Sequence, residues 1–473
     1  MKKKSVNLLL LTTLLILVSI FLFYDSFKLG FFADDISFIN GLNKVTNINQ
    51  LGEFNIYFDA GRELQPFWMW LFLNIANFFD QKILHLIQIF IYLTNSFLLF
   101  IILKSLNINK KISIIVSFYF LLFPLYAEVA FWTHNLAMTL LASFFFLIFL
   151  ILNINQYKKS NLINELYIIL FSILSIFTYE QYIYAIYAVI LLRLFFKEKI
   201  QFTESKKLVL FLNTLIIIAF SIYKLNEMKS MMLEGPNLNF LQIIQNIMIS
   251  IYLPFKTIVL FEYSIEKFAA TKFILIMFGI LIAVYFFNNV ENKKKTYNQK
   301  FNSITCYKLT LCILIYFAAF FPIYFHSISP RHFYLPSIFI MIGLASILDF
   351  FIKKNLFNQK LYKFTYLLLI VSTINNGMNL DQLKYSQIMN YKMKENFYKD
   401  IIKKLDNKEN INLINFPFTY NNTIFFASEQ PETIQFMLND KNLPLVSLNL
   451  NLNNNIEFKN VFNNKIIYKI LKN

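Results

Sequence analysis

Residues 83–103 read ILHLIQIFIYLTNSFLLFIIL, an apolar run in which His85 is the one side chain that could be charged near neutral pH. About twenty such residues cross the hydrocarbon core of a bilayer as a helix. Comparable runs lie at 6–24, 112–131, 136–153, 165–179, 182–196, 208–225, 272–288, 308–325, 333–352 and 362–376. The pattern predicts an all-α polytopic membrane protein with about eleven transmembrane helices.

The overall composition points the same way. Of the 473 residues, 57% are hydrophobic and only 15% are charged, and the mean hydropathy is +0.52. Soluble proteins contain about 25% charged residues, so a soluble enzyme or a nucleic-acid binder is excluded. The net charge of +17 does not call for a nucleic-acid partner, because membrane proteins concentrate Lys and Arg in their cytoplasmic loops.

The predicted loops carry Lys and Arg unevenly. The loops on the same side as residues 1–5 hold about twice as many basic residues as the opposite loops. This bias predicts a cytoplasmic N-terminus and, with an odd number of spans, an extracytoplasmic C-terminus.

Two further apolar stretches do not fit the span count. Residues 66–79 are short and mixed, and residues 240–261 are interrupted by Pro254 and Lys256. Both are predicted as helices that lie in the outer membrane interface. A crossing by 240–261 stays open, and it would reverse the topology of all later segments.

The composition changes from apolar to polar near residue 377. Residues 1–376 are predicted to form the transmembrane domain, with a first outer loop at 25–82. Residues 377–473 are rich in Asn and Lys, with short apolar runs such as 411–416. They are predicted to form a small, polar, extracytoplasmic α/β domain.

Ionisable and aromatic residues gather in four loops of the predicted outer face, far apart in the sequence. In a membrane protein such residues are costly and mark functional sites. The candidate catalytic residues are Asp34 and Asp35 of the first outer loop. The candidate substrate-binding residues are Arg62, Glu128, Trp132, His134, Glu180, Arg331, His332 and Tyr334.

The arginines are the most informative of these residues. Lysine supplies nearly all of the basic side chains, and the arginines are Arg62, Arg193 and Arg331. A guanidinium suits phosphate or carboxylate oxygens in a two-point contact, which predicts an anionic substrate near Arg62 and Arg331. Plainer interpretations remain: the Asp pair as a solvated turn, Glu128 as a paired helix-end residue, and the arginines as remnants of codon bias.

The motifs resemble those of the GT-C superfamily of integral membrane glycosyltransferases. The resemblance lies in Phe32-Ala33-Asp34-Asp35-Ile36, in Glu128-x-x-x-Trp132 and in Arg331-x-x-Tyr334-Leu335-Pro336-Ser337. Within the superfamily the chain is similar to bacterial relatives of the tetratricopeptide-bearing O-mannosyltransferases, and its first loop also resembles the O-antigen glucosyltransferases. The chain departs from the family pattern at Glu63, Phe123, Tyr126 and Leu136, which bears on the substrate more than on the reaction.

The resemblance implies an enzyme of the bacterial inner membrane. It would move a sugar from a polyprenyl-phosphate donor to a glycan, lipid or protein acceptor at the outer face. Asp34 would be the general base, Asp35 its neighbour or a metal ligand, and Arg331, with Arg62, would receive the phosphate. No cofactor is implied with certainty, and a divalent cation stays open. The expected partners are the donor, the acceptor and membrane lipids, with no nucleic acid.

Two other function classes stay open at this point. A polysaccharide or lipid-linked sugar transporter, or flippase, would line a path with charges that can be reached from both sides. An O-antigen ligase or polymerase would carry its main outer loop late in the membrane domain, whereas the Asp-bearing loop comes first in this chain.

Overall fold

The computed structural model describes most of the helical part of the chain. The described residues are 62–79, 82–158, 162–195, 240–259, 303–320, 330–353, 359–404 and 411–416, with short pieces at 26, 28–29, 39, 42, 45, 50–51, 211, 214–220, 222–223, 419–420, 423–424, 448–452 and 470–471. The predicted spans 6–24 and 272–288 and the candidate residues Asp34 and Asp35 lie outside this part.

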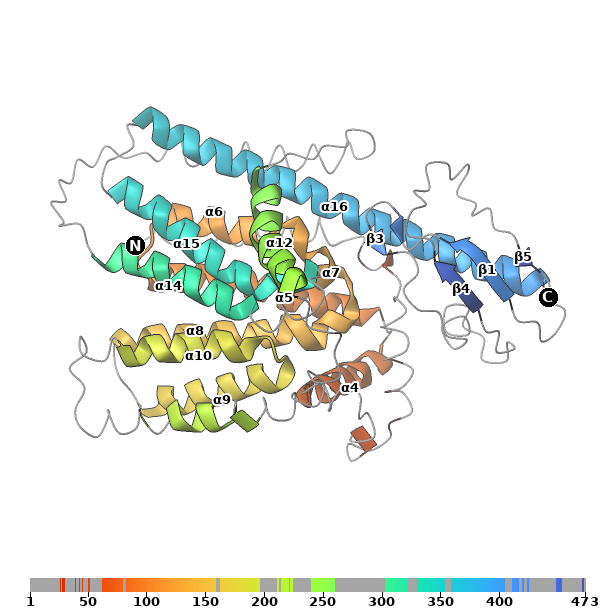
Figure 1. Ribbon diagram of the computed structural model, residues 1–473, viewed down its shortest axis with the longest axis horizontal. Coiled ribbons are helices and arrows are strands. Elements are labelled where there is room, and N and C mark those ends of the chain that lie inside the picture. Colours follow the sequence, from red (N-terminus) through yellow and green to blue (C-terminus); the bar gives the residue numbers. More distant parts are fainter. Residues whose placement is uncertain are drawn as a thin grey trace.

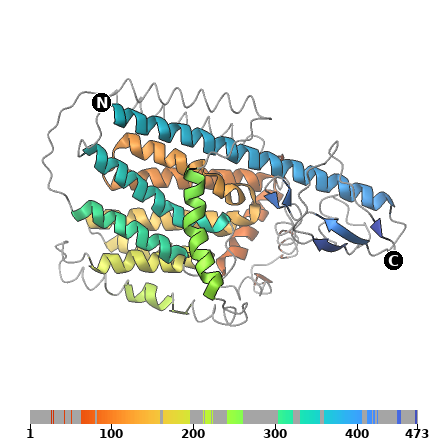
Figure 2. The ribbon, with the colours of Figure 1, turned by 45° about the horizontal axis from the view of Figure 1, so that its top comes forward.

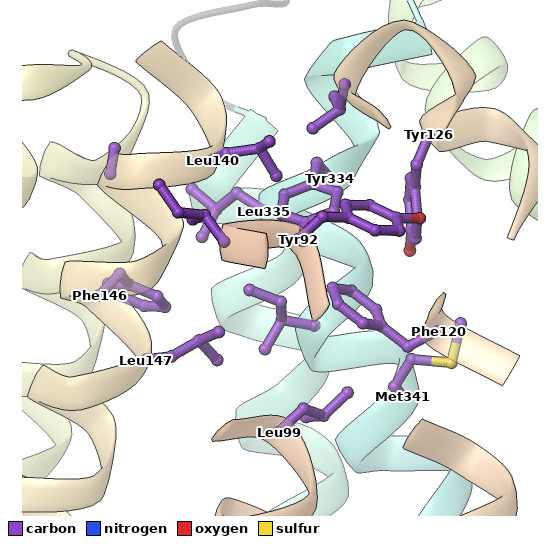
Figure 3. Packing of buried hydrophobic residues seen from close by; sticks show 14 of the residues in the cluster. Tyr92, Leu99, Phe120, Tyr126, Leu140, Phe146, Leu147, Tyr334, Leu335 and Met341 are labelled. Carbon is purple, nitrogen blue, oxygen red and sulfur yellow. The ribbon is translucent and has the colours of Figure 1, made fainter. Parts of the chain in front are cut away.

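The described core is a bundle of helices that run side by side (Figure 1). Its members are α5 (Ile83–Ser105), α6 (Lys110–Leu121), α8 (Leu141–Lys158), α9 (Leu162–Thr178), α10 (Tyr182–Phe195), α14 (Ser303–Phe320) and α15 (Tyr334–Lys353). Helix α5 packs between α6 and α8, α9 lies against α8, and α14 joins α15 to α10. The centre is filled by large apolar and aromatic side chains of α5, α6, α8 and α15 (Figure 3).

Three of the described helical stretches are long and apolar enough to cross a membrane. They are Ile83–Ser105, Thr133–Gln156 and Arg331–Ile352. A fourth span results if Lys110–Leu121 and Pro124–Phe131 are counted as one, although the two parts are bent by 46°. These apolar helices confirm an integral multi-pass membrane protein, while the full count of about eleven spans stays a prediction.

The predicted span 112–131 is bent and is not one straight helix. Helix α6 ends at Leu121, and the chain continues as the short helix η3 (Pro124–Tyr126) and then as α7 (Ala127–Phe131). Pro124 stands at the first position of η3, where a helix needs no backbone N–H donor. Its ring also disfavours a helical conformation of the residue before it, so α6 cannot continue through this point. After α7, Trp132 is extended, and η4 (Thr133–Asn135) and the π-helix η5 (Leu136–Leu140) lead into α8.

The turn between α5 and α6 shows how the sequence sets an antiparallel pair. Asn107, with φ of 60°, takes the left-handed conformation that commonly ends a helix. Asn109 then caps α6 by accepting a hydrogen bond from the Lys111 backbone N–H at 2.9 Å. The Asn109 backbone N–H donates to Asp349 Oδ1 at 2.9 Å, which holds this turn against α15.

Two further helices lie against the bundle. Helix α4 (Leu64–Asn77) covers the predicted interfacial stretch 66–79, and it packs against α9 and α5. Helix α12 (Phe240–Val259) runs steeply across the bundle helices in both views (Figures 1 and 2). This direction is the one expected of an interfacial helix, but the position of the membrane itself stays a prediction.

Helix α16 (Gln359–Lys404) joins the bundle to the C-terminal strands. Its 46 residues extend for about 69 Å at 1.5 Å per residue, whereas a hydrocarbon core is about 30 Å thick. It packs along α6 and then passes the end of the bundle (Figure 2). The predicted domain boundary after residue 376 therefore falls inside a continuous helix, because the composition turns polar before the helix ends.

Short strands come after α16, while the α/β domain predicted for residues 377–473 stays a prediction. They are β1 (Ile411–Phe416), β2 (Thr419–Tyr420), β3 (Thr423–Ile424), β4 (Leu448–Leu452) and β5 (Ile470–Leu471). One sheet has the order β4-β1-β5, with β1 parallel to β4 and antiparallel to β5. Strands β2 and β3 form a separate antiparallel pair.

Candidate functional site

The site is organised around the break between α6 and α8. The break places Glu128 on α7, Trp132 at the extended corner and His134 on η4. The short helix η8 (Pro330–Phe333), which carries Arg331 and His332, packs against both α7 and η3. Residues far apart in the sequence thus meet at one end of the bundle, as the sequence predicted for its loops.

Buried side chains of α5 hold the broken backbone together. Tyr92 Oη donates to the Leu121 carbonyl at 2.7 Å, where α6 ends. Gln88 Nε2 donates to the carbonyls of Val129 at 2.8 Å and Trp132 at 2.7 Å. These bonds replace the helical hydrogen bonds that the break removes, and a backbone at membrane depth needs such replacements.

Arg62 and Glu180 form a two-point ion pair. Arg62 Nε donates to Glu180 Oε2 at 2.7 Å, and a terminal Arg62 nitrogen donates to Oε1 at 2.5 Å. The guanidinium also lies 5.1 Å from the centre of the Tyr179 ring. The pair therefore joins the segment before α4 to the turn between α9 and α10, and it occupies the two-point face of the Arg62 guanidinium.

Arg331 has different surroundings. It lies beside Glu128, whose carboxylate interacts with both the backbone N–H and the guanidinium of Arg331. Its Nε atom is buried and has no hydrogen-bond partner in the part of the chain that the structure describes. A buried donor without a partner is costly, so an anionic oxygen at this position would be strongly favoured.

His134 lies near both arginines. Its side chain is buried, and it experiences the charges of both Arg331 and Arg62. Its Nε2 lies 3.5 Å from Nε2 of Gln65, which is fully buried on α4. Two guanidinium groups, two carboxylates and an imidazole thus share one small region.

The remaining candidates take structural positions around this region. Gln181 Nε2 donates to the His332 carbonyl at 2.8 Å, which fixes η8 against the turn after α9. Trp132 is buried with 6% of its surface exposed. Tyr334 is fully buried in the bundle core, where its ring packs edge-on against Tyr126 at 4.9 Å (Figure 3).

Sequence reasoning did not single out several residues that build the site. All of them are neutral. Backbone carbonyls accept hydrogen bonds from Gln88 and Gln181, the His134 imidazole lies next to Gln65, and the Arg62 guanidinium lies over the ring of Tyr179. Gln88 could have been found, since a buried amide inside an apolar run is itself unusual. The glutamines at 65 and 181 carry no comparable signal.

The structure offers no support for a metal centre in its described part. No group of three or more His, Cys, Asp or Glu side chains comes together among the described residues. The open question of a divalent cation therefore concerns Asp34 and Asp35, which lie outside them.

Comparison of the chain with protein-family models, with curated proteins and with solved structures found no match in any of the three. The described arrangement can bind an anion through Arg331, and it can orient a neutral polar group through Glu128 and His134.

Proposed function

We propose that this chain is a GT-C-type membrane glycosyltransferase. It transfers a sugar from a polyprenyl-phosphate-linked donor to a glycan, lipid or protein acceptor at the outer face of a bacterial inner membrane. The single observation that carries the proposal is the buried Arg331 Nε. This atom lacks a hydrogen-bond partner in the described part of the chain, and Arg331 lies beside Glu128.

The lipid phosphate is the ligand that fits this arrangement best. A phosphate needs two oxygens bound in one plane, which a guanidinium supplies, and its polyprenyl tail needs an apolar surface, which the adjoining helices supply. Arg62 is already neutralised by Glu180. Among the described site residues, Arg331 keeps a buried Nε–H that can donate to a phosphate oxygen.

The reaction needs little beyond this. The acceptor hydroxyl attacks the anomeric carbon while the bond from that carbon to the phosphate oxygen breaks, and the phosphate stays on the lipid. The hydroxyl proton passes to Asp34 as general base, and Arg331 stabilises the charge that grows on the leaving phosphate. A single displacement inverts the anomeric configuration.

The transporter alternative fits less well. A transported substrate needs a site that opens to both sides of the membrane. Beneath the site, the bundle is filled by Tyr92, Phe120, Tyr126 and Tyr334, all fully buried and in ring contact (Figure 3). A dense core of this kind favours a site that works from one face.

The test is binding of undecaprenyl phosphate to the purified protein in detergent, with undecaprenol as the uncharged comparison. The wild type should prefer the phosphate. Arg331→Lys should weaken this preference at least about tenfold, because the charge stays but the two-point contact is lost. Arg193→Lys is the matched control and should bind like the wild type. Equal binding of phosphate and alcohol by the wild type would refute the proposal.

A further inference from the structure

Gln88 makes an unusual pair of hydrogen bonds in the described bundle. It stands on α5 within a stretch apolar enough to span a membrane, and it is fully buried. One amide nitrogen donates to two carbonyls, those of Val129 and Trp132, at 2.8 and 2.7 Å. Burying an amide in such surroundings costs free energy unless the amide is hydrogen-bonded, so its bonds point to a role in the fold or the site.

One of the two carbonyls lies just before the corner of the broken span, and the other lies at the corner itself. Val129 belongs to α7, and Trp132 is the extended residue at which α7 ends, with φ of −94° and ψ of 118°. The Trp132 carbonyl also accepts a bond from the Asn135 N–H at 3.0 Å. Gln88 therefore fixes the place at which the backbone changes direction.

Three candidate site residues depend on this corner. Glu128 precedes it by one helical turn, Trp132 forms it and His134 stands two residues later. Asn135 fixes the corner from its other side, because its Nδ2 donates to the Glu128 carbonyl at 3.1 Å. A shift of the corner would move the Glu128 carboxylate relative to Arg331 and the His134 imidazole relative to Gln65.

The same stretch of α5 reaches toward the first outer loop. His85, one turn before Gln88, is buried and interacts with the Gln88 side chain and with the backbone of Leu29. Leu29 precedes the Asp34-Asp35 pair by five residues in the sequence. Helix α5 is thus in contact both with the corner and with Leu29 of the first outer loop.

We infer that Gln88 is a positioning residue that fixes the corner of the broken span and, through it, Glu128, Trp132 and His134. Its role in substrate binding rests on the proposed function, but its role at the corner does not. Gln88 touches no substrate in this proposal and acts through the two carbonyls that it holds.

The first test is amide hydrogen exchange of the full-length protein in detergent, read on peptides that cover residues 127–136. Gln88→Met keeps the length of the side chain and removes both donors. Exchange at the Trp132 and Asn135 amides should rise about tenfold, the effect of losing hydrogen bonds to a buried backbone. Ser96→Ala, which removes a bond from α5 to the Ser117 carbonyl, is the matched control and should leave this region unchanged.

Unchanged exchange in Gln88→Met would overturn the inference. If that variant does not insert, Gln88→Asn serves instead. Its amide is one methylene shorter and cannot hold both carbonyls, so a smaller rise at the same two amides is expected, and no rise would again overturn the inference.

The second test is the affinity for undecaprenyl phosphate. Gln88→Met should bind undecaprenyl phosphate about tenfold more weakly than the wild type, and Ser96→Ala should bind it with unchanged affinity. Raised exchange with unchanged affinity would overturn the link from the corner to the site. A wild type that does not bind the phosphate would refute the proposed function, while the exchange experiment would still decide the role of Gln88 at the corner.

Discussion

At the scale of single residues, Arg62 and Arg331 show that the same side chain can serve two purposes. Arg62 is bound at two points by Glu180, 118 positions away, whereas Arg331 keeps a buried nitrogen without a partner among the described residues. We therefore expect Arg62 to stabilise the fold around the site and Arg331 to bind the substrate, although the sequence suggested both for the phosphate.

A double-mutant cycle tests this division. Arg62→Met and Glu180→Gln should each destabilise the purified protein, and the coupling energy between them should be about 1 kcal/mol, as for a partly exposed ion pair. The side chains are 25% and 15% exposed, so solvent screens part of the interaction. The measurement is chemical unfolding in detergent. Strictly additive effects would contradict the assignment, as would a loss of phosphate affinity in Arg62→Lys as large as that in Arg331→Lys.

The general base is a prediction about Asp34. Asp34→Asn keeps the shape of the side chain but removes the proton acceptor, so sugar transfer should fall by about 10²–10⁴-fold. Transfer is measured with labelled lipid-linked sugar in isolated membranes, and the amount of inserted protein is measured by immunoblot. Asp35→Asn should also lower sugar transfer, by a smaller factor than Asp34→Asn. Near-normal turnover by Asp34→Asn would assign the base to Asp35 or Glu128.

At the scale of elements, hydropathy predicted straight apolar helices well and their interruptions poorly. The predicted spans 83–103 and 333–352 correspond closely to α5 and to Arg331–Ile352, because an apolar run is a local property. The break after Leu121 was missed. Pro124 marks it, but what makes it stable are Tyr92 and Gln88 from the preceding helix, and such contacts leave no local pattern.

The candidate site shows the same limit. Residue types in four loops predicted that distant segments meet, and the described loops do meet. The sequence could not show that Glu180 pairs with Arg62. Nor could it show that Tyr334 faces the core, because an aromatic residue at a helix start fits either a binding site or a packed bundle.

At the scale of the whole molecule, a group of lysines and the candidate site lie at opposite ends of the bundle. Lys104, Lys110 and Lys111 stand at the turn between α5 and α6, while the break and η8 lie at the other end of these helices. Basic residues gather on the cytoplasmic side of membrane proteins, so we expect the site on the outer side. Helix α16 contacts α7 and η3 at this same end before it leads into the strands.

The last prediction rests on this asymmetry. In a background with Cys306 and Cys312 replaced by serine, a cysteine at the exposed position Tyr385 of α16 should react with a membrane-impermeant maleimide in intact cells. A cysteine at the exposed position Lys104 should react only after the membrane is opened, because we expect its turn on the cytoplasmic side. The reverse labelling would place the site inside, where a polyprenyl-linked donor has no advantage over a nucleotide sugar. It would also mean that the interfacial interpretation of residues 66–79 is wrong, since a crossing by that stretch reverses both positions, whereas a crossing by 240–261 would reverse Tyr385 alone.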